Sequence, residues 1–361
     1  MRHHTIAAFF MIGAVFTLAR PAQAGAMQET GTDPDAGPGG ERRPPRVAPL
    51  FEQPGVLTPR GSYVLEPALQ YAYTSSDRIA IAGYALIPTL LPPRVDAREA
   101  RRNSTIASLT ARRGITNRFE VELRVPYVYR SDAIVSRDVS GGSASDRVFD
   151  SSGKHIGDVE LAARYQLNEG GFNRPYFVAG LRFKSRTGRD PFEVTTDCLT
   201  RCSGPGAAGT GLQLRLPTGS GFYALEPNLA WFMPSRPVTF FGTFSYMHNF
   251  KRSDLSRKIL NGESEFLGEM TPPDSFGFNA GVGFALNEKT TVSVGYDHIS
   301  VGRAEQNGQT LPGSLRIQLG TIMAGFSYRL DPHRTINVSA GAGLTREAPD
   351  LSLVVRIPFA F

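Results

Sequence analysis

Histidine and serine side chains that lie close together in sequence are the first candidates for catalysis in this chain. His298 has Ser293 and Ser300 nearby, so it could act as the base beside a nucleophile. The other histidines after residue 24 are His155, His248 and His333. The chain contains neither a Gly-x-Ser-x-Gly motif nor a His-Glu-x-x-His motif. We therefore expect loop or interfacial histidines, no catalytic residue and no enzyme.

The two cysteines of the chain are Cys198 and Cys202. A Cys-x-x-x-Cys pair could begin a metal site, but the chain has no further cysteine to complete it, and no histidine lies close in sequence. An exported protein meets an oxidising compartment, where such a pair forms a disulfide. We therefore predict a small disulfide within a loop, and we expect no metal site and no cofactor.

Charged residues recur at every second position in several segments, which would place them on one face of a strand. In residues 118–130 the intervening positions are apolar or aromatic, from Phe119 to Tyr129. Charges on one face and aromatic rings on the other suit the wet interior of a barrel better than a soluble sandwich. The candidate residues for lining that interior are Arg118, Glu120, Glu122, Arg124, Asp158, Glu160, Arg164, Arg182, Lys184, Arg186 and Glu226.

Two interpretations of these charges stay open. The ions could pair with one another and brace a narrow interior. They could instead line a path, in which case Arg182, Lys184 and Arg186, at spacing two, would form a basic ladder near the outer mouth. A basic mouth would attract anions. The apolar segment from Ile79 to Leu91 could hold an aromatic ring beside it.

The elements that must position these residues are strands. Period-two alternation runs from Gly61 to Phe361, and charges or prolines break every apolar run that could form a transmembrane helix there. Twelve strands are predicted, near residues 62–74, 103–113, 118–130, 156–167, 175–186, 219–233, 238–250, 275–286, 290–298, 316–330, 335–345 and 350–361. Ten or fourteen strands stay open, because the pattern is thin at 103–113. It also changes phase within 316–330, where we predict a bulge near Gly320.

The connections between the predicted strands alternate between short and long. Short turns are predicted near residues 114–117, 168–174, 234–237, 287–289 and 331–334. Long polar loops are predicted at residues 75–102, 131–155, 187–218, 251–273 and 299–314. This alternation is typical of periplasmic turns and extracellular loops, and it places both ends of the barrel segment in the periplasm.

Both ends of the chain carry features of an exported barrel. Residues 1–24 are predicted to be a signal peptide, because an uncharged apolar run follows Arg2 and Ala22-Gln23-Ala24 is a small-x-small cleavage site. Residues 25–60, rich in Pro, Gly and charge, are predicted to be a flexible periplasmic tail. The last strand ends in Phe361, like the assembly signal of outer-membrane barrels. We therefore predict an all-β, transmembrane, antiparallel up-and-down barrel of about 12 strands over residues 61–361, in the outer membrane of a Gram-negative bacterium.

The charge of the chain is mildly basic. The formal net charge is +6, and removing Arg2 and Arg20 with the signal peptide leaves 6 − 2 = +4. There is no basic helix and no aromatic recognition motif, so we expect no nucleic-acid partner. The 38 glycines and the 10% of aromatic residues suit tight turns and strands.

Five short stretches stand out by their order and spacing. They are Arg113-Gly114-Ile115-Thr116-Asn117-Arg118-Phe119-Glu120, Val125-Pro126-Tyr127, Gly157-Asp158-Val159, Leu216-Pro217-Thr218-Gly219-Ser220-Gly221 and Pro273-Asp274-Ser275-Phe276-Gly277. Together they resemble the outer-membrane family assigned to the MetA pathway of phenol degradation, whose members are described as transporters. The resemblance covers most of residues 61–361. It implies a barrel and suggests uptake of aromatic compounds, and it offers no catalytic residues to carry over.

These observations lead to one expected function and one alternative. We expect a channel for the passive passage of small solutes, with aromatic compounds or organic anions as candidates. The alternative is a structural or surface-interaction barrel with a closed lumen. The expected partners are outer-membrane lipid and lipopolysaccharide, the barrel-assembly machinery and a small-molecule solute.

Overall fold

The computed structural model describes residues 57–75, 97–138, 145–199, 202, 212–235, 237–311 and 314–361, and only the backbone at 97–100, 135–138 and 145–149. The predicted signal peptide, the tail up to residue 56 and the segment from Ile79 to Leu91 lie outside the described residues. Among the described residues, no helix is long and apolar enough to cross a membrane.

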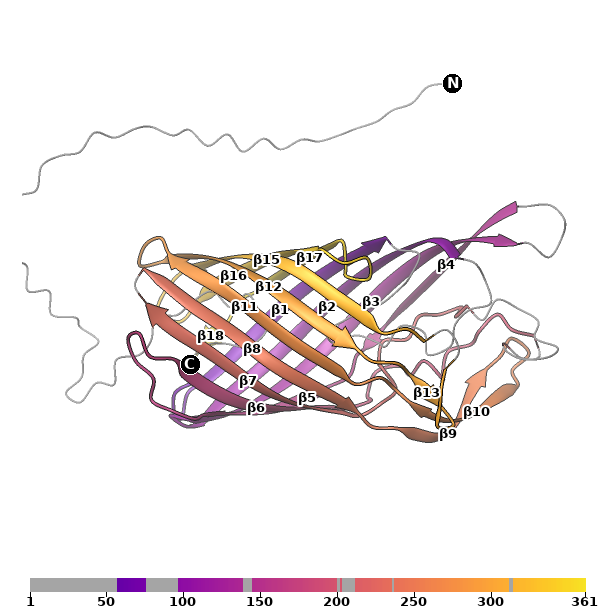
Figure 1. Ribbon diagram of the computed structural model, residues 1–361, viewed down its shortest axis with the longest axis horizontal. Coiled ribbons are helices and arrows are strands. Elements are labelled where there is room, and N and C mark those ends of the chain that lie inside the picture. Colours follow the sequence, from indigo (N-terminus) through magenta and orange to yellow (C-terminus); the bar gives the residue numbers. More distant parts are fainter. Residues whose placement is uncertain are drawn as a thin grey trace, which may run out of the picture. The chain divides into compact units, whose positions relative to one another are not determined.

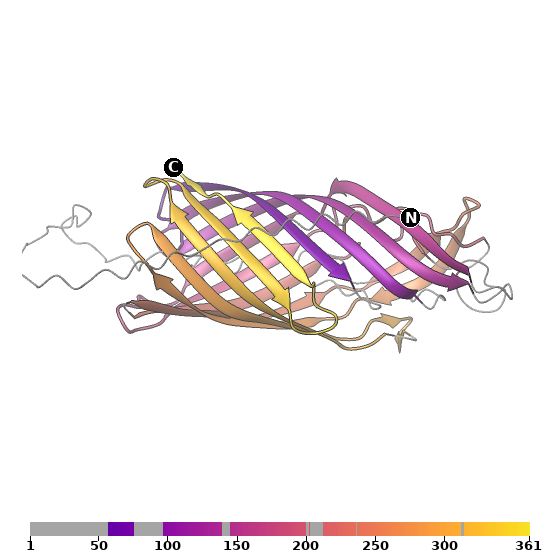
Figure 2. The same ribbon diagram turned by 90° about the horizontal axis from the view of Figure 1, so that it is seen from above.

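One antiparallel sheet closes into a barrel, because β17 pairs with β1 (Figures 1 and 2). Its strands are β1 (Tyr63–Ser75), β2 (Ala97–Thr116), β3 (Phe119–Asp138), β4 (Ser145–Ile156), β5 (Glu160–Gln166), β6 (Tyr176–Lys184), β7 (Ala224–Ser235), β8 (Val238–Asn249), β11 (Ser275–Ala285), β12 (Thr290–Val301), β15 (Ile317–Arg329), β16 (Thr335–Gly343), β17 (Leu351–Arg356) and β18 (Phe359–Ala360). β4 and β5 follow each other along β3, as β17 and β18 do along β1. The fourteen segments therefore make twelve barrel strands, which confirms the predicted number.

Alternation along each strand sorts side chains into two environments. On β3, Leu123 and Tyr127 are 45% and 50% exposed on the outer face, whereas Glu120 and Arg130 on the inner face are 0% and 2% exposed. Apolar side chains thus lie on the outer face and polar side chains on the inner face. This distribution is the reverse of that in a soluble protein, because lipid tails surround the outer face. The register of the ladder therefore fixes which residues enter the interior.

The short turns gather at one end of the barrel, which we call the periplasmic end, and the C-terminal residues lie there (Figure 1). The amide of Tyr63, at the start of β1, donates to the carbonyl of Phe361 over 3.1 Å, so the first and last strands meet at this end. The longer connections leave from the opposite end, which we call the extracellular end.

The phase change within β15 needs no bulge. The β12–β15 ladder runs without a register shift from Thr290↔Tyr328 to Val301↔Ile317, so the predicted bulge near Gly320 is wrong. Ile317 and Leu319 instead point into the barrel, where they pack with Ala348 from the β16–β17 connection. The connection supplies the apolar cover that lets these residues turn away from lipid.

The second and third strands are longer than predicted. β2 begins at Ala97 and β3 ends at Asp138, and these outer parts pair with each other and with β4. Figure 1 shows this extension, with β4, beyond the ends of the other barrel strands. Alternation across 103–113 is weak in sequence because several outward positions there are Ala, Thr or Asn rather than large apolar residues.

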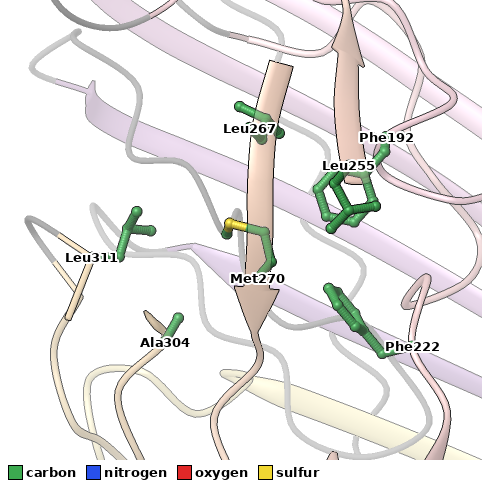
Figure 3. Close-up of a cluster of buried hydrophobic side chains, with 7 residues drawn as sticks. All are labelled: Phe192, Phe222, Leu255, Leu267, Met270, Ala304 and Leu311. Carbon is green, nitrogen blue, oxygen red and sulfur yellow. The ribbon is translucent and has the colours of Figure 1, made fainter. Parts of the chain in front are cut away.

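The extracellular connections form a packed cap, which the prediction of long polar loops did not anticipate. Four short strands, β9 (Arg252–Lys258), β10 (Ser264–Thr271), β13 (Glu305–Gln306) and β14 (Gln309–Thr310), make a second sheet. An apolar core joins this sheet to the β6–β7 connection (Figure 3). Its members are Phe192, Phe222, Leu255, Leu267, Met270, Ala304 and Leu311. The cap therefore has its own hydrophobic stabilisation.

The disulfide between Cys198 and Cys202 lies in this cap. Cys198 is fully buried and packs with Ile259, just after β9. The amide of Cys202 donates to a carboxylate oxygen of Glu265 over 3.0 Å, and Glu265 also pairs with Arg257 at 2.6 Å. The disulfide turn is thus held against the β9–β10 hairpin.

Candidate functional site in the barrel interior

A chain of alternating charges crosses four neighbouring strands on the inner face. Arg112 on β2 pairs with Glu66 on β1 at 2.9 Å and with Glu122 on β3 at 2.8 Å. Arg164 on β5 pairs with the same Glu122 at 2.6 Å and with Glu120 at 2.5 Å. All five side chains are nearly inaccessible to solvent, and a buried charge needs such partners to offset its desolvation.

A second group of charges lies further toward the extracellular end. Arg182 on β6 pairs with Glu226 on β7 and lies 3.5 Å from Glu160 on β5. Lys184 is directly opposite Glu160 in the ladder. The cations on this strand are therefore interleaved with acids from both neighbouring strands.

Two of the candidate lining residues lie elsewhere. The interpretation of Arg118 as lumen-lining is wrong, because it lies in the β2–β3 turn and forms an exposed pair with Glu169 at 2.6 Å. The placement of Arg186 is also wrong, since its guanidinium stacks over the outward-facing ring of Tyr223, 4.9 Å from the centroid. Both errors have one cause: β6 ends at Lys184 and β3 begins at Phe119, so alternation no longer governs these residues.

The end of the N-terminal tail contacts the inner charges. The amide of Thr58 donates to Glu120 over 2.7 Å, and Leu57 and Thr58 are both buried. A Cβ at Gly114 would lie 2.0 Å from the carbonyl oxygen of Pro59, so only glycine lets the tail pass so close to β2. The last residues of the tail thus lie against the barrel wall at its periplasmic end.

Asp158, in the gap between β4 and β5, fastens part of the β6–β7 connection. We call residues 212–222 the inner loop. Asp158 accepts hydrogen bonds from the amide and hydroxyl of Ser220, at 2.8 and 2.7 Å, and from the amide of Gly188 at 3.1 Å. It is 4% exposed. The carboxylate of Asp158 therefore accepts hydrogen bonds from three donors, and it does not line an open path.

Further contacts seat the inner loop against the barrel wall. The Thr218 hydroxyl donates to the carbonyl of Ile156 over 2.9 Å, and Arg130 donates through Nη1 to the carbonyl of Pro217 over 3.2 Å. A Cβ at Gly219 would lie 2.5 Å from Asp158 Oδ1, which explains the glycine. Because Arg130 faces inward, its bond to Pro217 places this loop on the inner side of β3.

The sequence prediction missed the inner loop, although a signal for it was present. The stretches Gly157-Asp158-Val159 and Leu216–Gly221 were both singled out by resemblance, and each is an unremarkable turn when taken alone. In the structure they bind each other across 62 positions of sequence. Contact between two such segments cannot be read from strand periodicity.

The opposite wall of the interior is built from small residues. On β8, β11, β12, β15 and β16 the inward positions of the ladder are mainly Gly, Ser, Thr and Asn. The larger inward residues include Phe241, Met247, Asp297 and Met323, together with Ile299, Val301, Ile317 and Leu319 near the extracellular end. Examples are Thr243, Asn279, Gly281, Gly283, Ser293, Gly295, Gly325 and Ser339. Asn279, Gly281 and Gly325 are only half-buried. The interior is thus asymmetric, with long paired ions on one wall and short polar side chains on the other.

The structure separates His298 from Ser293, whereas Ser300, the other serine considered for catalysis, faces outward like His298 and donates no hydrogen bond to it, since both contact Gln318 instead. His298 faces outward on β12, where it hydrogen-bonds Tyr296 at 3.0 Å and Gln318 at 2.9 Å. Ser293 faces inward on the same strand and is buried. The two side chains lie on opposite sides of the barrel wall, so they cannot act as a nucleophile and its base.

No family model matches the chain, so the resemblance to the phenol-degradation family stays a prediction. The solved structure of an outer membrane channel from Pseudomonas putida F1 superposes with a TM-score of 0.54 at 14% identity, covering 85% of this chain and 98% of that one. The translocator domain of the autotransporter NalP from Neisseria meningitidis gives 0.43 at 10% identity, covering 84% and 89%. The Ralstonia pickettii toluene transporter TbuX gives 0.42 at 10% identity, covering 86% and 92%. The first similarity shows that the fold is that of a Gram-negative outer-membrane barrel.

Proposed function

We propose that the protein is an outer-membrane channel for the passive passage of small polar solutes. The observation that carries this proposal is the asymmetric polar interior. A barrel that served only as a structural element would gain stability from an apolar filling, whereas buried ion pairs are at best weakly stabilising. A wall of Gly, Ser and Thr opposite a wall of paired ions leaves a polar route beside the small residues.

The width of such a route is limited by the fold. Twelve strands lie between eight-stranded barrels, whose side chains fill the interior, and porins with open aqueous channels. Long side chains such as Arg112 and Arg164 and the inner loop narrow the interior further. We therefore propose that the channel selects small molecules by size.

The charge of the interior argues against a strong selection by sign. Arg182 is paired with acids and Arg186 faces outward, so the predicted basic ladder does not form on β6. Passage of organic anions therefore needs a specific contact and cannot rest on a general positive potential.

A closed structural barrel remains the second candidate, and the buried tail residue Thr58 favours it. Its contact with Glu120 puts chain at the periplasmic end of the interior. For either function we propose the same surroundings: lipid and lipopolysaccharide around the outward apolar face, and the barrel-assembly machinery as the partner that inserts it.

Swelling of proteoliposomes tests the proposed function. Liposomes that contain the folded protein should swell faster in isotonic arabinose than in isotonic stachyose, because the smaller sugar passes the narrow interior. Liposomes prepared with heat-unfolded protein are the control. Swelling in arabinose no faster than in that control would refute the channel and favour the closed barrel.

A further inference from the structure

We propose that Arg130 and Ser104 form a binding site for the carboxylate of an organic anion whose body is apolar. This inference deepens the proposed function, since it names a solute class for the same interior. It rests on buried polar atoms that lack partners, on their shared position in the ladder, and on the apolar residues next to them.

Among the residues that the structure describes, Arg130 is the one with the most buried side-chain nitrogens left without a hydrogen-bond partner. Its side chain is 2% exposed, yet Nε and Nη2 have no hydrogen-bond partner among the described residues, and Nη1 donates to the carbonyl of Pro217. A buried donor without a partner is destabilising, and more so when it is charged. Such an arginine is expected to hold either water or a ligand.

The two unused nitrogens lie on one edge of the guanidinium. The Nε–H and one Nη2–H bond point in the same direction, and their spacing matches the two oxygens of a carboxylate. Pro217 occupies the remaining nitrogen, so the inner loop orients the group and leaves this edge available. A bidentate carboxylate is therefore the ligand that the geometry suits best.

The acids nearest to Arg130 are engaged with other groups. Asp132, two positions along β3, is bound by Arg102 through Nε at 2.6 and 2.8 Å. Asp158 is bound by Ser220 and Gly188. In the part of the chain that the structure describes, no carboxylate forms an ion pair with Arg130. Its positive charge is therefore left for an external anion.

Ser104 supplies a further unused donor at the same level. It lies directly opposite Arg130 in the β2–β3 ladder, faces inward and is buried. Within the described ranges of the chain, its hydroxyl has no hydrogen-bond partner. A carboxylate bound to Arg130 would also accept a hydrogen bond from the Ser104 hydroxyl. One ligand would then satisfy both buried side chains.

The neighbouring inward pair is apolar. Ile106 on β2 and Val128 on β3 are directly opposite each other, one inward level toward the periplasmic end from Ser104 and Arg130. Both are almost fully buried on the inner face. On the extracellular side the next inward pair is Arg102 and Asp132, and the inner loop contacts Arg130. A ligand with its carboxylate on Arg130 would thus place an apolar body toward Ile106 and Val128.

Calorimetric titration of the folded full-length protein in detergent micelles tests the site with three probes: benzoate, benzyl alcohol and acetate. Benzoate should bind more tightly than either of the others, because only it combines the carboxylate with an apolar body. Arg130→Gln should weaken benzoate binding at least about tenfold, as expected for loss of a charged hydrogen-bonded contact. Ser104→Ala should weaken it roughly threefold to tenfold. Ser104→Ala should also leave folding intact, since it removes only an unpartnered hydroxyl.

The control variant is Arg113→Gln. It removes an arginine from the same strand as Ser104, but this guanidinium stacks over Tyr63 on the outer side, 5.0 Å from the ring centroid. Benzoate affinity should not change. Equal affinity for benzyl alcohol or for acetate, or full affinity in Arg130→Gln, would overturn the proposal. If the protein passes the arabinose assay but does not bind benzoate, the proposed binding site is refuted and the channel proposal stands. Benzoate binding that depends on Arg130 in a protein that fails that assay would support the site and refute the channel.

Discussion

Single side chains in this barrel are governed by which solvent they meet. Outward positions near mid-membrane contact lipid and disfavour charge, whereas inward charges such as Glu122 and Asp158 are stabilised by an opposite charge or by several donors. Alternation predicts an inward direction for Glu120, Glu122 and Arg164, and in the β3–β5 ladder Glu120 lies directly opposite Arg164. It could not predict their pairing, because partners come from strands whose relative register is set by the whole ladder.

Two substitutions on β11 separate the lipid-facing and inner environments. Val282 faces outward beside Val294, so Val282→Arg should lower the free energy of unfolding by about 2–4 kcal/mol, the usual range near mid-membrane. Asn279 faces inward directly opposite Asp297, so Asn279→Arg should cost much less. Urea unfolding of both variants in lipid vesicles measures this difference. Equal losses would contradict the assigned faces of the strand.

At the scale of elements, the connections between the strands shape the barrel interior more than the strands themselves do. Strand number and turn placement followed from periodicity and polarity, and they agree with the structure. The extracellular cap and the inner loop did not follow, because their contacts join segments far apart in sequence, such as Phe192 and Leu311. The apolar residues of these segments are not spaced at a regular period, so the sequence does not indicate that they form a common core.

The anchoring of the inner loop by Asp158 gives a prediction for this element. The amide of Gly188 donates to Oδ1 of Asp158 and the amide of Ser220 to Oδ2, so Asp158→Asn leaves one of these two amides facing an NH2 donor, and the loop should detach more often. Trypsin should then cleave faster after Arg215, which is already exposed. Asp350→Asn is the matched control, because Asp350 accepts from the amide and hydroxyl of Ser75 at 2.7 and 2.6 Å in another part of the barrel. Unchanged cleavage in Asp158→Asn would argue against the anchor.

At the scale of the whole molecule, the barrel combines an apolar outer face with an interior that is polar but largely charge-compensated. The outer face was predictable because lipid contact imposes strict alternation, and the strand number was restricted to even values because bacterial single-chain barrels have even numbers of strands. The asymmetry between the ionic wall and the small-residue wall was not anticipated. Gly277, Gly281 and Gly283 of β11 are visible in the sequence, but only the closed sheet places them across the interior from Arg112 and Arg164.

Single-channel recording in planar lipid bilayers tests the central claim, that this interior is an open polar path. Folded wild-type protein should give a small, steady, ohmic conductance in potassium chloride, consistent with a narrow barrel of twelve strands. Asp158→Asn should conduct more and fluctuate, because the inner loop is released. If neither protein conducts after its insertion into the bilayer has been verified, the account is contradicted and the closed barrel is favoured.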